Sequence, residues 1–471
     1  MTKYFSYDKF VKVYFVYKSG DFVTKDMTTG SPMKNIIKFC FPLMLGQLFQ
    51  QLYNMADTII VGRFVGKTAL SAVGSVGALN FLIIGSVIGL CTGFAIPIAQ
   101  RFGAQDIKSL KKYVANIIYT SAVLGVVITV AAVLLTHPLL KILNTPEEIY
   151  QDAYDYIVII FAGIGATIFY NLLASIVRSL GDSKTPLYFL IFSSVLNVVL
   201  DILLITVLDM GVRGASVATV ISQIVSGILC FIYVKRSFPI LHIDKETSKP
   251  DFKYIKNLLR NGLPMALQFS ITALGSVIFQ SCVNGLGADV IAAATIGAKT
   301  QLMIVLPAET IGITMATYCG QNLGAGKFDR IKKGIGRGFI LAAIYSVIGI
   351  CVARFLGPYI SLLFISGSET QVIALAQQYI EMGSYFYLVL SVLFLLRNAL
   401  QGLGYSLTAM TTGVFELAAR GIGGFVFVRQ YGYDAACVVN PVAWIVADLF
   451  LFPAFFVVMN KLSKKFKEKQ N

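Results

Sequence analysis

Long apolar stretches recur along the whole of this 471-residue sequence, and no other feature restricts its fold as strongly. A helix that crosses a bilayer needs about 20 consecutive apolar residues. About twelve such stretches can be marked, near residues 36–61, 69–98, 114–136, 156–177, 187–208, 214–234, 262–284, 290–319, 338–356, 379–400, 407–428 and 435–460. Charged residues make up only 13% of the chain, against about 25% in soluble domains. We therefore predict an all-α integral membrane protein with twelve transmembrane helices.

Three short motifs occur twice in the same order, which indicates an internal repeat. The paired motifs are Phe41-Pro42-Leu43 with Leu263-Pro264-Met265, Gln100, Gly103 and Ala104 with Gln321, Gly324 and Ala325, and Leu180, Gly181, Ser183 and Thr185 with Leu403, Gly404, Ser406 and Thr408. We predict two six-helix lobes related by this repeat. Because six is an even number, both lobes enter the membrane from the same side, as in transporters that work by alternating access.

The lobes are expected at 27–236 and 251–460, joined by a polar linker at 237–250 and followed by a basic tail at 461–471. Residues 1–26 form an N-terminal extension without a clean apolar core, so no cleavable signal is expected there. Our hypothesis is that Met27 is the natural start, because it leads directly into the first span. N-terminal sequencing of untagged protein that found the extension intact would refute it.

The net charge of +15 would suit a nucleic-acid-binding protein, but the positions of the bases give another explanation. Lys and Arg are concentrated in alternate connections, at 101–112, 235–260, 327–337 and 461–469. The positive-inside rule therefore predicts that these connections and both termini are cytoplasmic. No nucleic acid is needed to account for the basicity, and the expected surroundings are a lipid bilayer.

Ionisable residues inside the spans are the strongest candidates for a functional site. Each costs about 2.5 to 3.5 kcal/mol on insertion into the bilayer, so each needs a reason to be there. The first lobe contains Asp57 and Asp201, with no Lys or Arg deep in the same spans. The second lobe contains both signs, in a predicted charge network of Lys299, Glu309, Arg397, Glu416 and Arg420. The second lobe can neutralise its own charges, whereas the first cannot.

An unpaired buried carboxylate can take up a proton or bind a cation, and either would serve as a coupling device. Gln50, Tyr53 and Asn54 precede Asp57 on one helix face, and Asn197 precedes Asp201 by four residues. Their oxygens suit Na⁺ as well as a proton network. The alternative is that the two acids are hydrogen-bonded for packing alone. Pro42, on the same span as Asp57, either permits a kink or lies at the helix start.

Other chemistry is not supported by the motifs. The stretch from Gly62 to Thr68 lacks the spacing of a phosphate-binding loop and follows a membrane helix instead of a strand. His137 and His242 fall in predicted loops, and the seven cysteines lie in or beside apolar spans without metal-like spacing. No nucleophile motif occurs. We therefore expect neither an enzyme, nor a resident metal, nor a cofactor.

Three motifs together resemble those of the MATE (multidrug and toxic compound extrusion) family. They are Tyr53-Asn54-Met55-Ala56-Asp57 followed by Val61-Gly62, the run from Gly320 to Lys327, and Arg178-Ser-Leu-Gly-Asp182 before Pro186. The resemblance covers the chain from about Met27 to Leu462. It implies a bacterial inner-membrane antiporter, with two six-helix lobes, that exports organic cations in exchange for H⁺ or Na⁺. A monomer without a cofactor is expected.

The resemblance also implies particular site residues. The family's first-lobe cation site matches Asp57, Asn197, Asp201 and Thr219, and its bending proline matches Pro42. The candidate substrate-binding residues are Gln50, Tyr53, Asn54 and Asn171. Some members place coupling acids on the seventh and tenth helices, but the seventh span here has no acid and the tenth carries Arg397. This departure favours coupling through the first lobe.

The remaining alternatives are of different classes. A flippase of lipid-linked cell-wall or polysaccharide precursors would place several bases along its cavity for a pyrophosphate, whereas the first lobe offers acids. An ion channel is disfavoured because no filter-like carbonyl loop occurs. The coupling ion and the exported compound are left open by the sequence.

Overall fold

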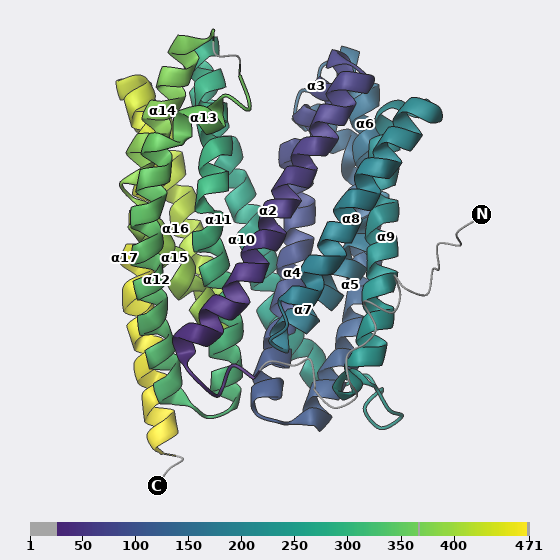
Figure 1. The fold of residues 1–471 in the computed structure, drawn as a ribbon, viewed down its shortest axis with the longest axis vertical. Helices are drawn as coiled ribbons and strands as arrows, with labels where there is room; N and C mark the ends of the chain where they lie inside the picture. Colours follow the sequence, from purple (N-terminus) through teal and green to yellow (C-terminus); the bar gives the residue numbers. More distant parts are fainter. Residues whose placement is uncertain (1–25, 366–367, 469–471) are drawn as a thin grey trace, which may run out of the picture.

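The chain folds into two helical bundles that meet at one end and diverge toward the other (Figure 1). The computed structural model describes residues 26–365 and 368–468, so the predicted extension lies outside the described residues except for Asp26. Within these ranges the regular secondary structure is entirely helical. We call the end where the bundles meet, at the bottom of Figure 1, the closed end.

Each lobe is built from helices of different lengths. The first lobe contains α2 (Pro32–Phe64), α3 (Lys67–Ser75), α4 (Gly77–Gly103), α5 (Ile107–Ile142), α6 (Glu147–Ala162), α7 (Ile164–Ser179), α8 (Lys184–Ile202) and α9 (Gly211–Ser237). The second contains α10 (Phe252–Val283), α11 (Ala288–Gly324), α12 (Phe328–Phe355), α13 (Gly357–Ser361), α14 (Thr370–Ser384), α15 (Tyr387–Gly402), α16 (Ser406–Ile422) and α17 (Arg429–Lys467). A π-helical segment follows α8 at Leu203–Val207, and another follows α16 at Gly423–Val428.

The number of crossings agrees with the twelve predicted. Eight helices are long and apolar enough to span a membrane, and the bent pairs α6–α7 and α14–α15 raise the number to ten. The 62-residue stretch Ser406–Lys467 is counted once among these, although one crossing needs only about 20 residues. The chain bends within it at Gly432, whose φ is 62°. The twelfth crossing in this count is the first helix, α2. It is less apolar than the others because its sequence contains several glutamines, Asn54 and Asp57.

Two predicted spans are not straight. The fourth, expected at 156–177, consists of α6 and α7 with a bend of 48° between them, and the tenth, expected at 379–400, consists of α14 and α15 with a bend of 56°. The first bend lies at Gly163, where a Cβ atom would come within 2.4 Å of the Val220 side chain. Close packing at this position thus requires glycine, and the apolar pattern alone does not reveal the bend.

Helix α2 connects the two lobes instead of belonging wholly to the first. Its early residues Ile36, Phe39 and Leu43 are buried in a core formed mainly by the second lobe. Its later residues pack against α8, and Figure 1 shows the helix running diagonally across the molecule. The helix continues unbroken through Pro42, which is buried. The alternative that Pro42 lies at the helix start is therefore wrong.

The repeated motifs meet at the closed end and join the lobes. Gln100 Nε2 on α4 donates to the carbonyl of Gly402 at 2.9 Å, and Gln321 Nε2 on α11 donates to the carbonyl of Ser179 at 2.9 Å. The two hydrogen bonds are equivalent under the internal repeat. Each runs from one lobe to the other. We call this arrangement the glutamine clamp.

Two glycines bring the backbones together beside the glutamine clamp. A Cβ atom on Gly103 would lie 1.9 Å from the carbonyl oxygen of Gln321, and one on Gly324 would lie 1.8 Å from that of Gln100. Contacts this short leave no room for any side chain. The second repeated motif therefore encodes a close approach of α4 and α11.

We expect Gly103→Ala to open the closed end. The added methyl group overpacks the seam at a cost of about 1 to 3 kcal/mol, which favours states in which the closed end is open. Cys319, which is fully buried, should therefore react with a maleimide about ten times faster. The rate can be measured by peptide mass spectrometry. Gly336→Ala is the matched control, because a Cβ atom there would meet nothing within 4 Å. Equal Cys319 labelling in both variants would contradict the assignment.

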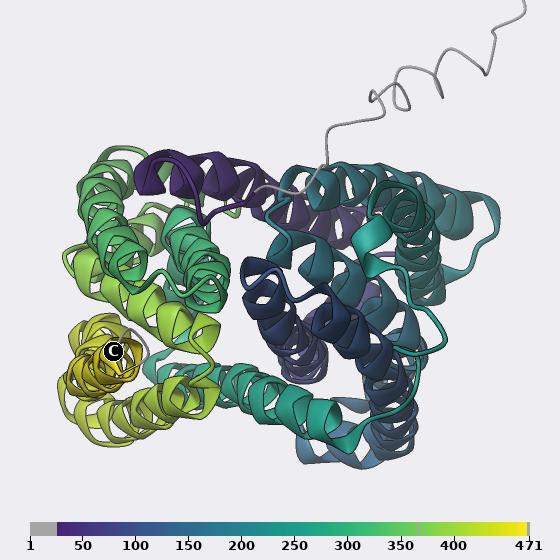
Figure 2. The same cartoon turned by 90° about the horizontal axis from the view of Figure 1, so that it is seen from below.

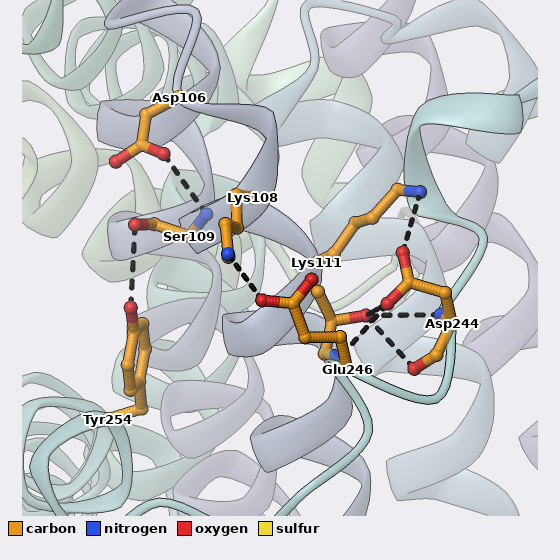
Figure 3. A network of polar contacts seen from close by, with 8 residues as sticks. Asp106, Lys108, Ser109, Lys111, Asp244, Glu246 and Tyr254 are labelled. Atoms are coloured by element: carbon orange, nitrogen blue, oxygen red, sulfur yellow. Dashed lines mark hydrogen bonds and ion pairs between the residues drawn. The ribbon is translucent and has the colours of Figure 1, made fainter.

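The linker between the lobes is held against the start of α5 (Figure 3). Lys108 forms an ion pair with Glu246, and Lys111 Nζ lies 3.4 Å from Asp244 Oδ2. Farther along, the Tyr119 hydroxyl donates to the carbonyl of Ser248 at 2.9 Å. The linker thus follows the first lobe before it enters α10.

Hydrogen bonds from Thr247, with a smaller effect of Lys111, hold the pKa of Asp244 below its ordinary value of 3.8. Because the pKa is lowered, ionised Asp244 stabilises the linker above pH 3.8, and this contribution is lost as the pH falls further. We expect amide hydrogen exchange in 244–250 to be faster in Asp244→Asn than in the wild type at pH 7. The difference should vanish well below pH 3.8. A difference that persists in acid would contradict this role of the charge.

Candidate functional site

The first lobe brings its two buried acids together. Asp57 on α2 and Asp201 on α8 lie close enough for their carboxyl groups to interact. Asp201 is fully buried, and its Oδ1 atom has no hydrogen-bond partner among the described residues. Asp57 is half-buried. An acid pair of this kind is under strain whenever both members are ionised, because like charges repel strongly at low dielectric.

Amide and hydroxyl groups complete the surroundings of the acid pair. Asn197, one turn before Asp201 and also buried, donates from its side-chain nitrogen to Asp57 Oδ1 at 2.6 Å. Its side-chain oxygen accepts from the backbone N–H of Thr219 at 3.3 Å. The amide takes this orientation because its nitrogen must face the carboxylate. The Tyr53 side chain lies close enough to Asp57 and Thr219 to interact with both.

The chemistry of these groups fits a proton or a small monovalent cation. Two carboxylates, an amide and two hydroxyls supply hard oxygen donors, and the unpartnered Asp201 oxygen is free to accept another bond. No ion pair within the described ranges reaches either acid; the nearby Asp155 is paired with Arg213 at 2.8 Å. No group of three His, Cys, Asp or Glu side chains suited to a metal occurs in the described chain.

Three of the four candidate substrate residues lie within about one turn of α2. Tyr53 belongs to the surroundings of the acid pair, and Gln50 and Asn54 are exposed. Asn171 lies on another helix, α7, where it donates to the carbonyl of Thr167 at 2.9 Å.

The second lobe neutralises most of its buried charge. Arg397 on α15 lies 2.9 Å from Glu416 on α16, and Arg420, one turn farther on, lies 3.1 Å from the other Glu416 oxygen. All three side chains are buried. Arg420 also donates to Asn440 on α17 at 2.9 Å. We call Arg397, Glu416 and Arg420 the charge triad.

Two residues of the predicted network are outside the charge triad. Glu309 on α11 is close enough to Arg397 for their charges to interact, but it forms no ion pair within the described residues. Lys299 is exposed, with Nζ 5.7 Å from the centre of the Phe364 ring. Ten helical residues place it about 15 Å along the axis from Glu309. Its inclusion in one network was wrong for this reason.

Asp448 was missed by the sequence reasoning. It lies on α17, is buried, and has one carboxylate oxygen without a partner in the described structure. Arg397 and Glu416 are its charged neighbours. An acid in the twelfth span was a signal available from the sequence, by the same rule that singled out Asp57 and Asp201.

Comparison with known proteins decides the family. The MatE family model matches residues 42–203 and 264–423, one segment in each lobe. The probable multidrug resistance protein YpnP of Bacillus subtilis is 30% identical over 392 residues, which cover 83% of this chain and 87% of that protein. This chain belongs to the MATE family. The probable multidrug resistance protein NorM of Thermotoga maritima is 28% identical, over 84% of this MATE chain and 86% of that protein.

Solved MATE structures share the fold. A solved structure described as the outward-facing conformation of a multidrug resistance MATE family transporter has a TM-score of 0.86 and 22% identity, covering 95% of this chain and 100% of that one. A structure described as MATE in the bent conformation has a TM-score of 0.85 and 23% identity, covering 96% and 100%. At this identity the likeness concerns the fold alone.

The other motifs that resembled the MATE family contribute to structure at the closed end. Asp182 lies two residues before α8, and its Oδ1 atom accepts from the backbone N–H groups of Lys184 and Thr185 in the first turn at 2.9 and 3.1 Å. In the Gly320–Lys327 run, Gln321 belongs to the glutamine clamp, and Lys327 Nζ donates to the carbonyl of Thr28 at 2.9 Å. These residues position helices and chain ends instead of forming the site.

We expect Glu416→Gln to destabilise this MATE protein strongly. The substitution leaves Arg397 and Arg420 buried without their carboxylate, and breaking a buried pair costs about 3 to 5 kcal/mol. A lower midpoint of thermal unfolding in detergent would show this. Glu369→Gln, which changes an exposed carboxylate of the same lobe, should unfold like the wild type. Equal midpoints for the two variants would mean that the charge triad contributes little stability.

Proposed function

We propose that this MATE protein is a secondary antiporter that exports small organic cations in exchange for H⁺ or Na⁺. The observation that carries the proposal is the proximity of Asp57 and Asp201, with a buried Asp201 oxygen that has no partner, and no base paired with either acid, in the part of the chain that the structure describes. Such a site gains most from a cation that can come and go. The names of the multidrug relatives support small organic molecules as cargo.

We further propose that the closed end is cytoplasmic. The connections at this end contain Arg101, Lys327 and Lys333, in keeping with the positive-inside rule for a bacterial inner membrane. The termini would then both be cytoplasmic, and the diverging ends of the lobes would face outward. The proposed lobes remain 27–236 and 251–460, acting as a monomer without a cofactor.

Helix α2 offers a physical route from the ion to the lobes. Its early part lies against the second lobe, where Thr310 Oγ1 donates to Gln47 Oε1 at 2.7 Å. Its later part carries Asp57 against Asp201 of the first lobe. A cation or proton between the acids removes their repulsion and favours close contact of α2 with α8. Because α2 also packs against the second lobe, a change in that contact alters how α2 holds the two lobes relative to each other.

The same neutralisation explains exchange. When the acid pair is ionised, its negative charge attracts a cationic substrate to the first lobe. When H⁺ or Na⁺ is bound, that attraction is lost and the substrate dissociates. By linkage, substrate and coupling ion must weaken each other's binding by the same free energy. An exchange cycle follows if the ion binds from outside and leaves to the cytoplasm.

The test is efflux of ethidium from proteoliposomes under an imposed pH gradient and, separately, an imposed Na⁺ gradient. We expect Asp57→Asn and Asp201→Asn each to reduce gradient-driven efflux by more than about tenfold, since each removes a charge that both ligands use. The gradient that drives wild-type efflux identifies the ion. Asp209→Asn is the control, because Asp209 is exposed and its φ of 49° is one that Asn also tolerates.

Wild-type efflux rates in both Asp57→Asn and Asp201→Asn would refute the acid pair as the coupling site. Wild-type protein that transports without either gradient would refute antiport with these ions. Loss of efflux in Asp209→Asn as well would show that the assay responds to first-lobe charge in general, and this too would count against the assignment.

A further inference from the structure

A hollow of about 690 Å³ lies at the closed end, on one side of the glutamine clamp. Its walls come from α4, α10, α11 and α17 and from the turn before α16. Figure 2 looks onto this end of the molecule and shows the end of α17 on the second-lobe side, where the C-terminus is marked. The hollow is thus a feature of the seam between the lobes, far from the acid pair.

The side chains that line the hollow include three bases and no acid. The polar and charged residues among them that can face a ligand are Gln100, Asn257, Arg260, Tyr405, Lys461 and Lys465. None of the three bases forms an ion pair within the described residues, although all three are exposed. Three like charges around one hollow attract an anion, and they repel one another when it is absent.

The internal repeat shows that the equivalent place on the other side of the clamp is filled. There, Gln321 Oε1 accepts a hydrogen bond from the backbone N–H of Met27 at 2.9 Å. The segment Met27–Gly30 is held in place by Arg330, which donates to the carbonyls of Met27 and Gly30 at 3.1 and 2.8 Å. The chain itself therefore occupies one of the two equivalent places.

The corresponding chain segment on the side of the hollow takes another course. The residues before α10 form the linker, which is bound to α5. The backbone N–H of Asp251 donates to the side-chain oxygen of Asn116 at 2.8 Å, and the carbonyl of Ser248 accepts from the Tyr119 hydroxyl. Gln100 Oε1, the counterpart of the Gln321 atom, receives no hydrogen bond from the described chain. The segment Met27–Gly30 thus fills the place beside Gln321, whereas the equivalent place beside Gln100 is the open, basic hollow.

We propose that this hollow binds a phosphate-bearing anion, such as the headgroup of an anionic glycerophospholipid. Arg260, Lys461 and Lys465 supply charge-assisted hydrogen bonds, and Asn257 and Tyr405 supply neutral donors. Basic pockets between helices at a cytoplasmic membrane face suit such headgroups. Gln100 belongs to the first lobe, and Arg260 lies on the part of α10 that packs against that lobe, whereas Lys461 and Lys465 lie on α17 of the second lobe. The complete site therefore exists only while the lobes are closed at this end.

The test measures thermal unfolding of the purified full-length protein against three additives. They are inorganic phosphate, dioctanoyl phosphatidylglycerol and the zwitterionic dioctanoyl phosphatidylcholine. We expect phosphatidylglycerol to raise the unfolding midpoint at a lower concentration than phosphate, and phosphatidylcholine to have no effect. If phosphatidylglycerol and phosphate raise the midpoint at equal concentrations, the ligand is a soluble phosphate instead of a lipid headgroup. The assignment of the hollow to a phosphate-bearing anion would still hold.

Variants show whether the effect arises at the hollow. The combined substitutions Arg260→Gln, Lys461→Gln and Lys465→Gln should raise the half-saturating anion concentration at least about tenfold. The control combines Lys253→Gln, Lys333→Gln and Arg337→Gln, which removes the same types of exposed base outside the hollow. It should leave the concentration unchanged. Gly103→Ala, which parts the seam, should also weaken the response.

Three results would overturn the proposal. They are the absence of any anion-dependent shift in the wild type, an equal loss in the two triple variants, and a shift that phosphatidylcholine produces as strongly as phosphatidylglycerol. An undiminished response in Gly103→Ala would overturn the dependence on closure. All substituted bases are exposed, so we expect both triple variants to fold, and unfolding in the absence of anion provides the check.

Discussion

The close approach of α4 and α11 at the closed end is the contact on which the arrangement of the lobes depends. Two glycines let the backbones touch, and two equivalent glutamines then reach across to carbonyl groups of the opposite lobe. Each hydrogen bond contributes only about 1 kcal/mol net. The contact is therefore specific in geometry without being strong. The lobes can diverge elsewhere because they are joined here.

The acid pair depends on the same architecture through α2. That helix is buried with the second lobe at its start and with the first lobe at its end. Asp57 is thus carried by an element that both lobes constrain, whereas Asp201 and Asn197 are fixed within the first lobe. In the second lobe the buried charge of Glu416 is instead neutralised by direct ion pairs with Arg397 and Arg420. The two lobes thus differ in that the acids of the first have no basic partner among the described residues, whereas Glu416 of the second has two.

Much of this arrangement could be predicted from the sequence. Apolar length gave the helical class and the number of crossings, and the cost of buried charge singled out Asp57 and Asp201. The repeat exposed the motifs of the glutamine clamp, but not their contact, because the partners Gln100 and Gly402 are distant in sequence. The diagonal course of α2 and the bends at Gly163 and after Ser384 depend on tertiary packing. Lys299 was misplaced because the apolar pattern did not show that this side chain lies on an exposed face of α11.

The π-helical segments after α8 and α16 have a consequence for how the site is presented. A π-helical turn closes through an i→i+5 hydrogen bond and so takes in one more residue than an α-helical turn. The residues on the two sides of such a segment therefore no longer follow one regular spacing of about 100° per residue. One of these segments begins two residues after Asp201. The helix face that carries Asn197 and Asp201 is thus set independently of the face that the following residues present.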